Sequence, residues 1–192
     1  IYTQTERRID IFVSVAGTGG TIGGVSKYLK EQNSNIKVIS VDPDGSGIFN
    51  FLQTGEYVAS EGSSFTEGIG IMRLVENFRQ ANIDYAINLP DKDIVTIANA
   101  VRQQDALVLG SSSALNVCAA FYAALAFGPH SGGTKQTIVT LACDLGERSS
   151  SKLYNPDFLA AKQIQPAQQS IHQLKDKYAA DLSRLVAVSF GH

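Results

Sequence analysis

A stretch rich in glycine and threonine, residues 14–24, carries the side chains most suited to chemistry. Its centre consists of Gly17, Thr18, Gly19, Gly20 and Thr21. Glycine lets the backbone approach a ligand closely, and the free N–H groups of a first helical turn favour negative charge. Because an apolar run precedes this stretch and a helical pattern follows it, we predict a phosphate cradle with two hydroxyl donors. A glycine-rich turn without a ligand is the alternative.

The glycine spacing leaves two kinds of phosphate ligand open. Gly17 and Gly19 match the dinucleotide pattern G-x-G-x-x-G, but Ile22 occupies its third glycine position, and the Walker pattern is absent. Asp42 follows the next apolar run, where a dinucleotide-binding fold places the acid that binds the ribose. The loop therefore predicts either a dinucleotide site or a site for the single phosphate of another cofactor.

Further polar turns are expected at the same edge of the molecule. Residues 110–113 offer three serine hydroxyls at a helix start, residues 144–148 follow an apolar run, and residues 67–70 are a candidate fourth segment. Ligands of open α/β sheets bind at the carboxyl ends of the strands. The histidines lie away from these turns, and cysteine and histidine do not cluster at metal-ligand spacing. We predict no catalytic histidine and no metal site.

The elements that must position these turns alternate between strand and helix. Apolar runs predict buried strands at residues 9–16, 36–41, 83–89, 105–109 and 136–143. Helical spacing predicts helices at residues 25–31, 91–101, 114–127 and 166–190. Residues 47–66 have weak periodicity, and residues 73–80 fit either a short helix or a loop. The pattern indicates the α/β class, with a mostly parallel twisted sheet and helices on both faces.

Composition restricts the partners. The chain of 192 residues has 44 % hydrophobic residues and a formal net charge of -2 without a basic stripe, so we expect no nucleic-acid partner. No apolar run approaches the ~20 residues that span a bilayer, so we expect no membrane partner. Cys118 and Cys143 are predicted to be buried thiols of a reducing compartment. The apolar stripe of the tail is expected to pack on its own domain, with a partner helix as the alternative.

Five motifs, in this order and spacing, resemble the cysteine synthase and cystathionine β-synthase family. The motifs occupy residues 17–21, 41–46, 67–70, 107–112 and 144–154. This family consists of pyridoxal-phosphate enzymes of fold type II (tryptophan synthase β-like). The resemblance covers about residues 1–158 and implies an incomplete chain, with residues 1–160 as the C-terminal part of the catalytic fold and residues 161–192 as a helical tail.

The resemblance implies roles for single residues. The 5′-phosphate of pyridoxal phosphate is held by Gly17, Thr18, Gly19, Gly20 and Thr21. Ser111 faces the pyridine nitrogen, and Gly68 lies near the ring. A hydroxyl leaves that nitrogen essentially neutral, which makes the ring a weaker electron sink and suits loss of a β-leaving group. Ser113 departs from the family, which usually has glycine there.

The implied activity is β-replacement, as in cysteine synthase acting on O-acetylserine and sulfide, or β-elimination, as in cysteine desulfhydrase. The expected partners are a small amino-acid substrate, the missing N-terminal half of the enzyme and a second subunit in a homodimer. The expected location is the cytoplasm, with the mitochondrion as the alternative. The family's Schiff-base lysine belongs to the N-terminal half, so we predict no catalytic residue here and expect this chain alone to be inactive. A dinucleotide-binding Rossmann module and a non-catalytic remnant used for protein contact are the alternative functions.

Overall fold

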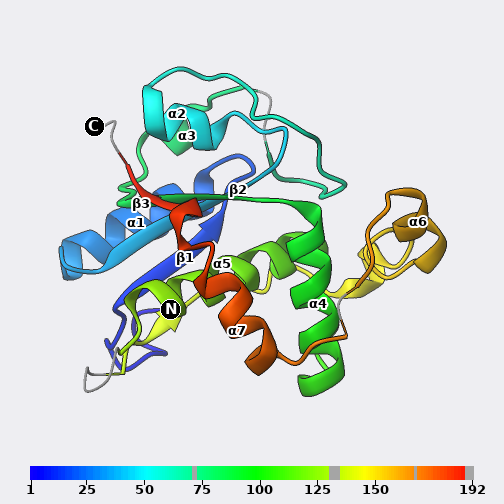
Figure 1. Cartoon of the computed structure of the whole chain (residues 1–192). Helices are drawn as coiled ribbons and strands as arrows, with labels where there is room; N and C mark the ends of the chain where they lie inside the picture. The colour runs from blue at the N-terminus through cyan, green and yellow to red at the C-terminus, as the bar shows by residue number, and fades with distance from the viewer. Residues whose placement is uncertain (71–72, 130–134, 167, 189–192) are drawn as a thin grey trace.

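The computed structural model describes residues 1–70, 73–129, 135–166 and 168–188. Within them five strands form one sheet in the order β4-β1-β2-β3-β5 (Figure 1). The strands are β1 Ile11–Val15, β2 Lys37–Pro43, β3 Tyr85–Leu89, β4 Ile138–Val139 and β5 Leu185–Ala187. The first four run parallel, and β5 runs antiparallel to β3. The predicted α/β class with a mostly parallel sheet is confirmed.

Helices cover both faces of the sheet, because successive side chains of each strand point to opposite faces. Phe12 and Val38 pack on one face with α1 (Gly20–Gln32), α2 (Ile48–Thr54) and α3 (Glu76–Arg79). Val13 and Ile39 pack on the other face with α4 (Asp91–Asp105), α5 (Ser111–Phe127) and α7 (Ile171–Ala179). The short elements α6 (Pro156–Ala161), η1 (Gly146–Ser149) and η2 (Leu182–Arg184) complete the chain. All five strand residues of β1 are buried, so the loop that follows β1 starts from a rigid base.

Two of the predicted strands need correction. Residues 105–109 form no strand, because α4 continues to Asp105 and Leu109 makes only an isolated antiparallel bridge with Leu145. Residues 136–143 form only the two-residue β4 and then leave the sheet. The weakly periodic region contains the helix α2, which the sequence did not predict, and residues 73–80 contain the short helix α3.

The tail also differs from the single helix predicted for residues 166–190. Ser170 and Gln173 form a capping box that starts α7, and the chain then turns into η2 and β5. Leu174 and Tyr178 are fully buried. The helix α7, which carries them, lies beside α4 and α5 (Figure 1). The described tail therefore packs on its own domain. Residues 167, 189 and 190 of the predicted helix, together with His130 and His192, lie outside the described residues.

Candidate active site

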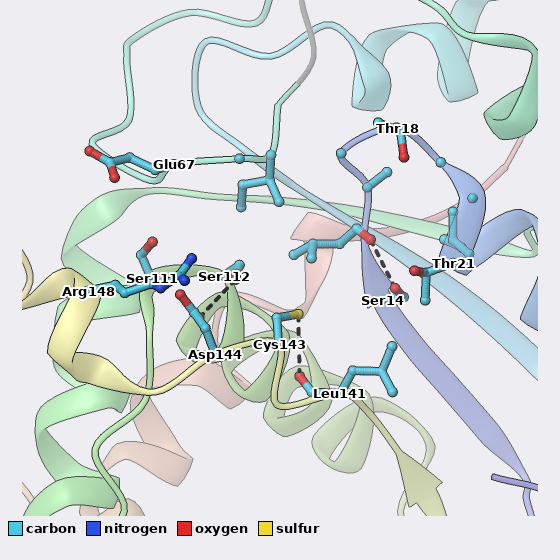
Figure 2. Close-up of a pocket in the computed structure, with 18 of the residues that line it drawn as sticks. Ser14, Thr18, Thr21, Glu67, Ser111, Ser112, Leu141, Cys143, Asp144 and Arg148 are labelled. Atoms are coloured by element: carbon cyan, nitrogen blue, oxygen red, sulfur yellow. Dashed lines mark hydrogen bonds between the residues drawn. The ribbon is translucent and has the colours of Figure 1, made fainter.

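The predicted turns meet in one pocket at the carboxyl end of β1, with a volume of about 520 Å³. Figure 2 shows Thr18 and Thr21 on one side of this pocket and Ser111, Asp144 and Arg148 on the other. All the predicted site residues line it: Gly17, Thr18, Gly19, Gly20, Thr21 and Ser111. Residues 67–69 also line it, so the four segments expected at this edge do come together.

The glycine loop has the geometry of an anion cradle. Gly19 has a φ of 76°, a left-handed conformation that favours glycine. Gly19 is the N-cap of α1, and no side chain caps that helix. The first N–H groups of α1 therefore donate no capping hydrogen bond to a side chain. A Cβ atom added at Gly17 would lie 2.5 Å from the carbonyl oxygen of Gly68. The loop therefore packs directly against residues 67–70, and the Gly70 N–H donates to the Ala16 carbonyl at 3.3 Å.

The opposite side of the pocket is the start of α5. The Ser111 N–H donates to Ser149 Oγ at 3.0 Å. The hydroxyl of Ser113 donates to the Asp144 carbonyl at 3.0 Å and accepts from the Asp144 N–H at 3.1 Å. Ser113, the position where the resemblance leads us to expect glycine, is thus fully buried and joins α5 to residues 144–148. This pair of bonds fixes Ser111 relative to the turn that carries Arg148.

The charged side chains around the pocket are few. Glu67, Asp144 and Arg148 line it, and Glu67 forms an ion pair with Lys152. None of the nine lysines, all of which lie in the described part of the chain, lines the pocket. Among the described residues no group of three His, Cys, Asp or Glu side chains is placed to hold a metal ion.

Asp42, the candidate ribose ligand of the dinucleotide interpretation, does not line the pocket. Its side chain is buried, and Oδ2 accepts the Phe49 N–H at 2.9 Å, close to the start of α2. Desolvation by burial raises the pKa of this carboxyl to about 6. Asp42 therefore holds α2 in place and is not available to a ligand in this pocket.

The raised pKa of Asp42 predicts a pH dependence of stability. A carboxyl whose pKa is higher in the folded state stabilises the fold most below its unfolded pKa, and that stabilisation is lost as pH rises through about 6. Urea unfolding of Asp42→Asn should lack this loss, which amounts to up to about 3 kcal/mol in the wild type. A variant with the same pH profile as the wild type would contradict the assignment.

The two cysteines differ, and the prediction that both are buried is wrong for one of them. Cys118 is fully buried in α5, and burial raises the pKa of its thiol well above the usual value. Cys143 is exposed and lines the pocket (Figure 2). The reason is that the chain leaves the sheet after Val139, so the end of the apolar run lies at the pocket and not in the core.

We expect Cys143 to react at least tenfold faster than Cys118 with iodoacetamide in the native protein, because exposure and thiolate fraction govern thiol reactivity. Peptide mass spectrometry over a time course measures both rates. Millimolar pyridoxal phosphate should slow alkylation of Cys143 if it occupies the pocket. Equal rates for the two thiols would contradict the described burial.

The same chain regions are matched by known proteins. Residues 1–144 match the family described as "Pyridoxal-phosphate dependent enzyme". Cysteine synthase of Dictyostelium discoideum is 39 % identical over 168 residues, which cover 83 % of this chain and 43 % of that protein. A putative mitochondrial cysteine synthase of Saccharomyces cerevisiae is 38 % identical over 164 residues, 79 % of this chain and 40 % of that protein.

A solved structure agrees with these sequence matches. The crystal structure of O-acetyl serine sulfhydrylase isoform 3 from Entamoeba histolytica superposes with a TM-score of 0.69 at 26 % identity, over 92 % of this chain and 47 % of that chain. The chain spans less than half the length of each of these relatives. It belongs to the family of pyridoxal-phosphate dependent enzymes, and its fold is the fold-type II arrangement predicted from the motifs.

The predicted site residues are not the whole lining of the pocket, because Ser14, Leu141, Cys143 and Ser149 also line it. Ser14 begins the stretch of residues 14–24, and Ser149 lies inside the motif at residues 144–154, but neither was singled out as a site residue. Leu141 and Cys143 belong to the apolar run of residues 136–143, which carries no separate signal for a pocket.

Proposed function

We propose that this pocket binds pyridoxal phosphate, with the phosphate on residues 17–21 and the pyridine ring toward Ser111. The observation that carries the proposal is that the uncapped start of α1 and Ser111 line the same pocket from opposite sides. The donor set fits a phosphate monoester, since it combines backbone N–H groups, two threonine hydroxyls and the positive end of the dipole of α1. When bound, the cofactor supplies an electron sink for carbanion chemistry.

The residues of this chain bind and orient the cofactor. The N–H groups of the first turn of α1 and the hydroxyls of Thr18 and Thr21 would donate hydrogen bonds to the phosphate and so stabilise its charge. The Ser111 hydroxyl would donate to the ring nitrogen, which would leave that nitrogen unprotonated and make the ring a weaker electron sink. Gly68, whose carbonyl lies against Gly17, keeps the wall beside the ring free of side-chain bulk.

For the whole enzyme we infer β-replacement or β-elimination on a small amino acid: cysteine, serine or O-acetylserine. The relatives named cysteine synthase support this reaction class. A homodimer and a location in the cytoplasm or the mitochondrion are part of the same proposal. In the described part of the chain no helix is both long and apolar enough to cross a membrane.

The reaction is tested on the protein as it occurs in its source, incubated with O-acetylserine plus sulfide, with serine and with cysteine. Formation of cysteine, sulfide or pyruvate in one assay supports the proposal. Absence of turnover in all three contradicts it.

Binding by the 192-residue chain is tested separately through the threonines. We expect millimolar affinity for pyridoxal phosphate, about -4 kcal/mol. The double change Thr18→Ala and Thr21→Ala should weaken binding severalfold, because it removes both hydroxyl donors to the phosphate. Ser111→Ala should barely change the affinity, because its hydroxyl contacts the ring and not the phosphate. Chemical-shift titration measures both, and a larger loss for Ser111→Ala would contradict the proposed orientation.

A further inference from the structure

The end of β1 lacks a neighbouring strand on one side. β4 pairs with β1 only at Ile11 and Phe12. Beyond that point the edge of β1 would leave backbone groups without partners in a buried region, which costs free energy. Two side chains replace the missing strand. The Thr140 hydroxyl donates to the Val13 carbonyl at 2.8 Å, and the Val15 N–H donates to Asn116 Oδ1 at 2.7 Å.

Asn116 makes more contacts than this replacement needs. It is fully buried in α5. Its Nδ2 donates to the Leu141 carbonyl at 2.9 Å and approaches Cys143 Sγ at 3.5 Å. One amide group therefore bonds to the end of β1 and to residues 141–143 while its backbone belongs to α5. Both of its polar atoms are used, so the side chain has one defined orientation.

These bonds lie between the two sides of the pocket. Val15 stands two residues before Gly17, and Asn116 stands five residues after Ser111 in the same helix. We propose that Asn116 is a positioning residue that fixes the distance between the phosphate cradle and Ser111. The proposal rests on the proposed function, because the distance matters only to a ligand that contacts both sides. Thr140 bonds to β1 from the chain beyond β4 and makes no bond to α5, so it does not set this distance.

The test compares two probes on the full chain. Inorganic phosphate needs the cradle alone, whereas 4′-deoxypyridoxine 5′-phosphate needs both sides and has no aldehyde to react with lysine. Asn116→Leu keeps the number of side-chain heavy atoms and the branch at Cγ and removes both polar atoms. In this variant we expect the Kd of the phosphopyridine to rise at least fivefold, because the whole α5 side of the pocket, and not the Ser111 hydroxyl alone, moves relative to the ring. The Kd of inorganic phosphate should change less than twofold. Amide chemical shifts of the residues in the cradle measure both constants.

Two further variants separate positioning from general loss of stability. Thr140→Val removes the other side-chain bond to β1 and should leave the ratio of the two Kd values unchanged. Asn116→Asp, measured at a pH where the buried carboxyl is protonated, keeps an acceptor for the Val15 N–H and a donor for the Leu141 carbonyl, and it should keep the wild-type ratio within twofold. If Asn116→Leu does not fold, the test depends on Asn116→Asp alone. A ratio of the two Kd values in Asn116→Asp that differs from the wild-type ratio by more than twofold then overturns the proposal.

The outcomes distinguish this inference from the function on which it depends. A wild-type chain that does not bind the phosphopyridine contradicts the proposed cofactor site, and this inference with it. Suppose instead that the wild-type chain binds the phosphopyridine. If Asn116→Leu then leaves the ratio of the two Kd values unchanged, or if Thr140→Val changes that ratio equally, only the positioning role of Asn116 is contradicted.

Discussion

Replacing Gly17 with alanine is expected to weaken binding of pyridoxal phosphate at least tenfold, about 1.4 kcal/mol. The new Cβ atom would lie 2.5 Å from the Gly68 carbonyl oxygen, closer than any normal contact. Because that oxygen belongs to the backbone, the cradle and residues 67–70 must move apart, and both line the pocket. The same strain should lower the free energy of unfolding by about 1–3 kcal/mol. Chemical-shift titration and urea unfolding measure the two effects.

Gly24 provides the matched control for Gly17. It lies in α1, the helix that follows the loop of Gly17, and a Cβ atom added there meets nothing within 4 Å. Gly24→Ala should therefore leave the affinity unchanged and stabilise α1 by about 0.5–1 kcal/mol, because alanine loses less backbone entropy than glycine. Equal losses of affinity in Gly17→Ala and Gly24→Ala would show that the contact with Gly68 is not the cause.

Truncating Leu174 to alanine should destabilise the chain by about 2–5 kcal/mol, the usual cost of a cavity left by a buried leucine. Leu174 is fully buried where α7 packs in the same core as α4 and α5. The tail is thus an integral part of this core, and its loss should be felt in the global unfolding transition. Thermal and urea unfolding of the variant, with the midpoint and slope compared with those of the wild type, provide the measurement.

Lys175, the exposed neighbour of Leu174 on α7, serves as the control. Lys175→Ala should change the free energy of unfolding by no more than about 0.5 kcal/mol, as most surface substitutions do. If both variants unfold at the wild-type midpoint, α7 does not dock on this core, and its apolar stripe serves a partner.

The sequence alone determined the central unit of the fold and most of the pocket. A buried apolar strand, five residues rich in glycine and threonine, and a helical pattern are local signals, and they predicted β1, the turn that follows it and α1 correctly. The rule that parallel strands present their carboxyl ends at one edge then brought residues 67–70, 110–113 and 144–148 to the same place. Periodicity also predicted α4 and α5, since both have long buried faces.

Only the tertiary structure decided features that depend on distant partners. An apolar run has the same sequence pattern whether or not a neighbouring strand is available to pair with it. For this reason residues 105–109 and Cys143 were predicted to lie inside the sheet, which does not extend to them. Asp42 was a candidate ligand from its position after a strand, but the structure shows that it is buried and supports α2. The sequence does not reveal this, because the desolvation of a carboxyl depends on the residues that surround it in the fold. Asn116 had no signal at all. Its importance arises because β4 stops after two residues, which leaves the Val15 N–H to be satisfied by a side chain 101 positions away.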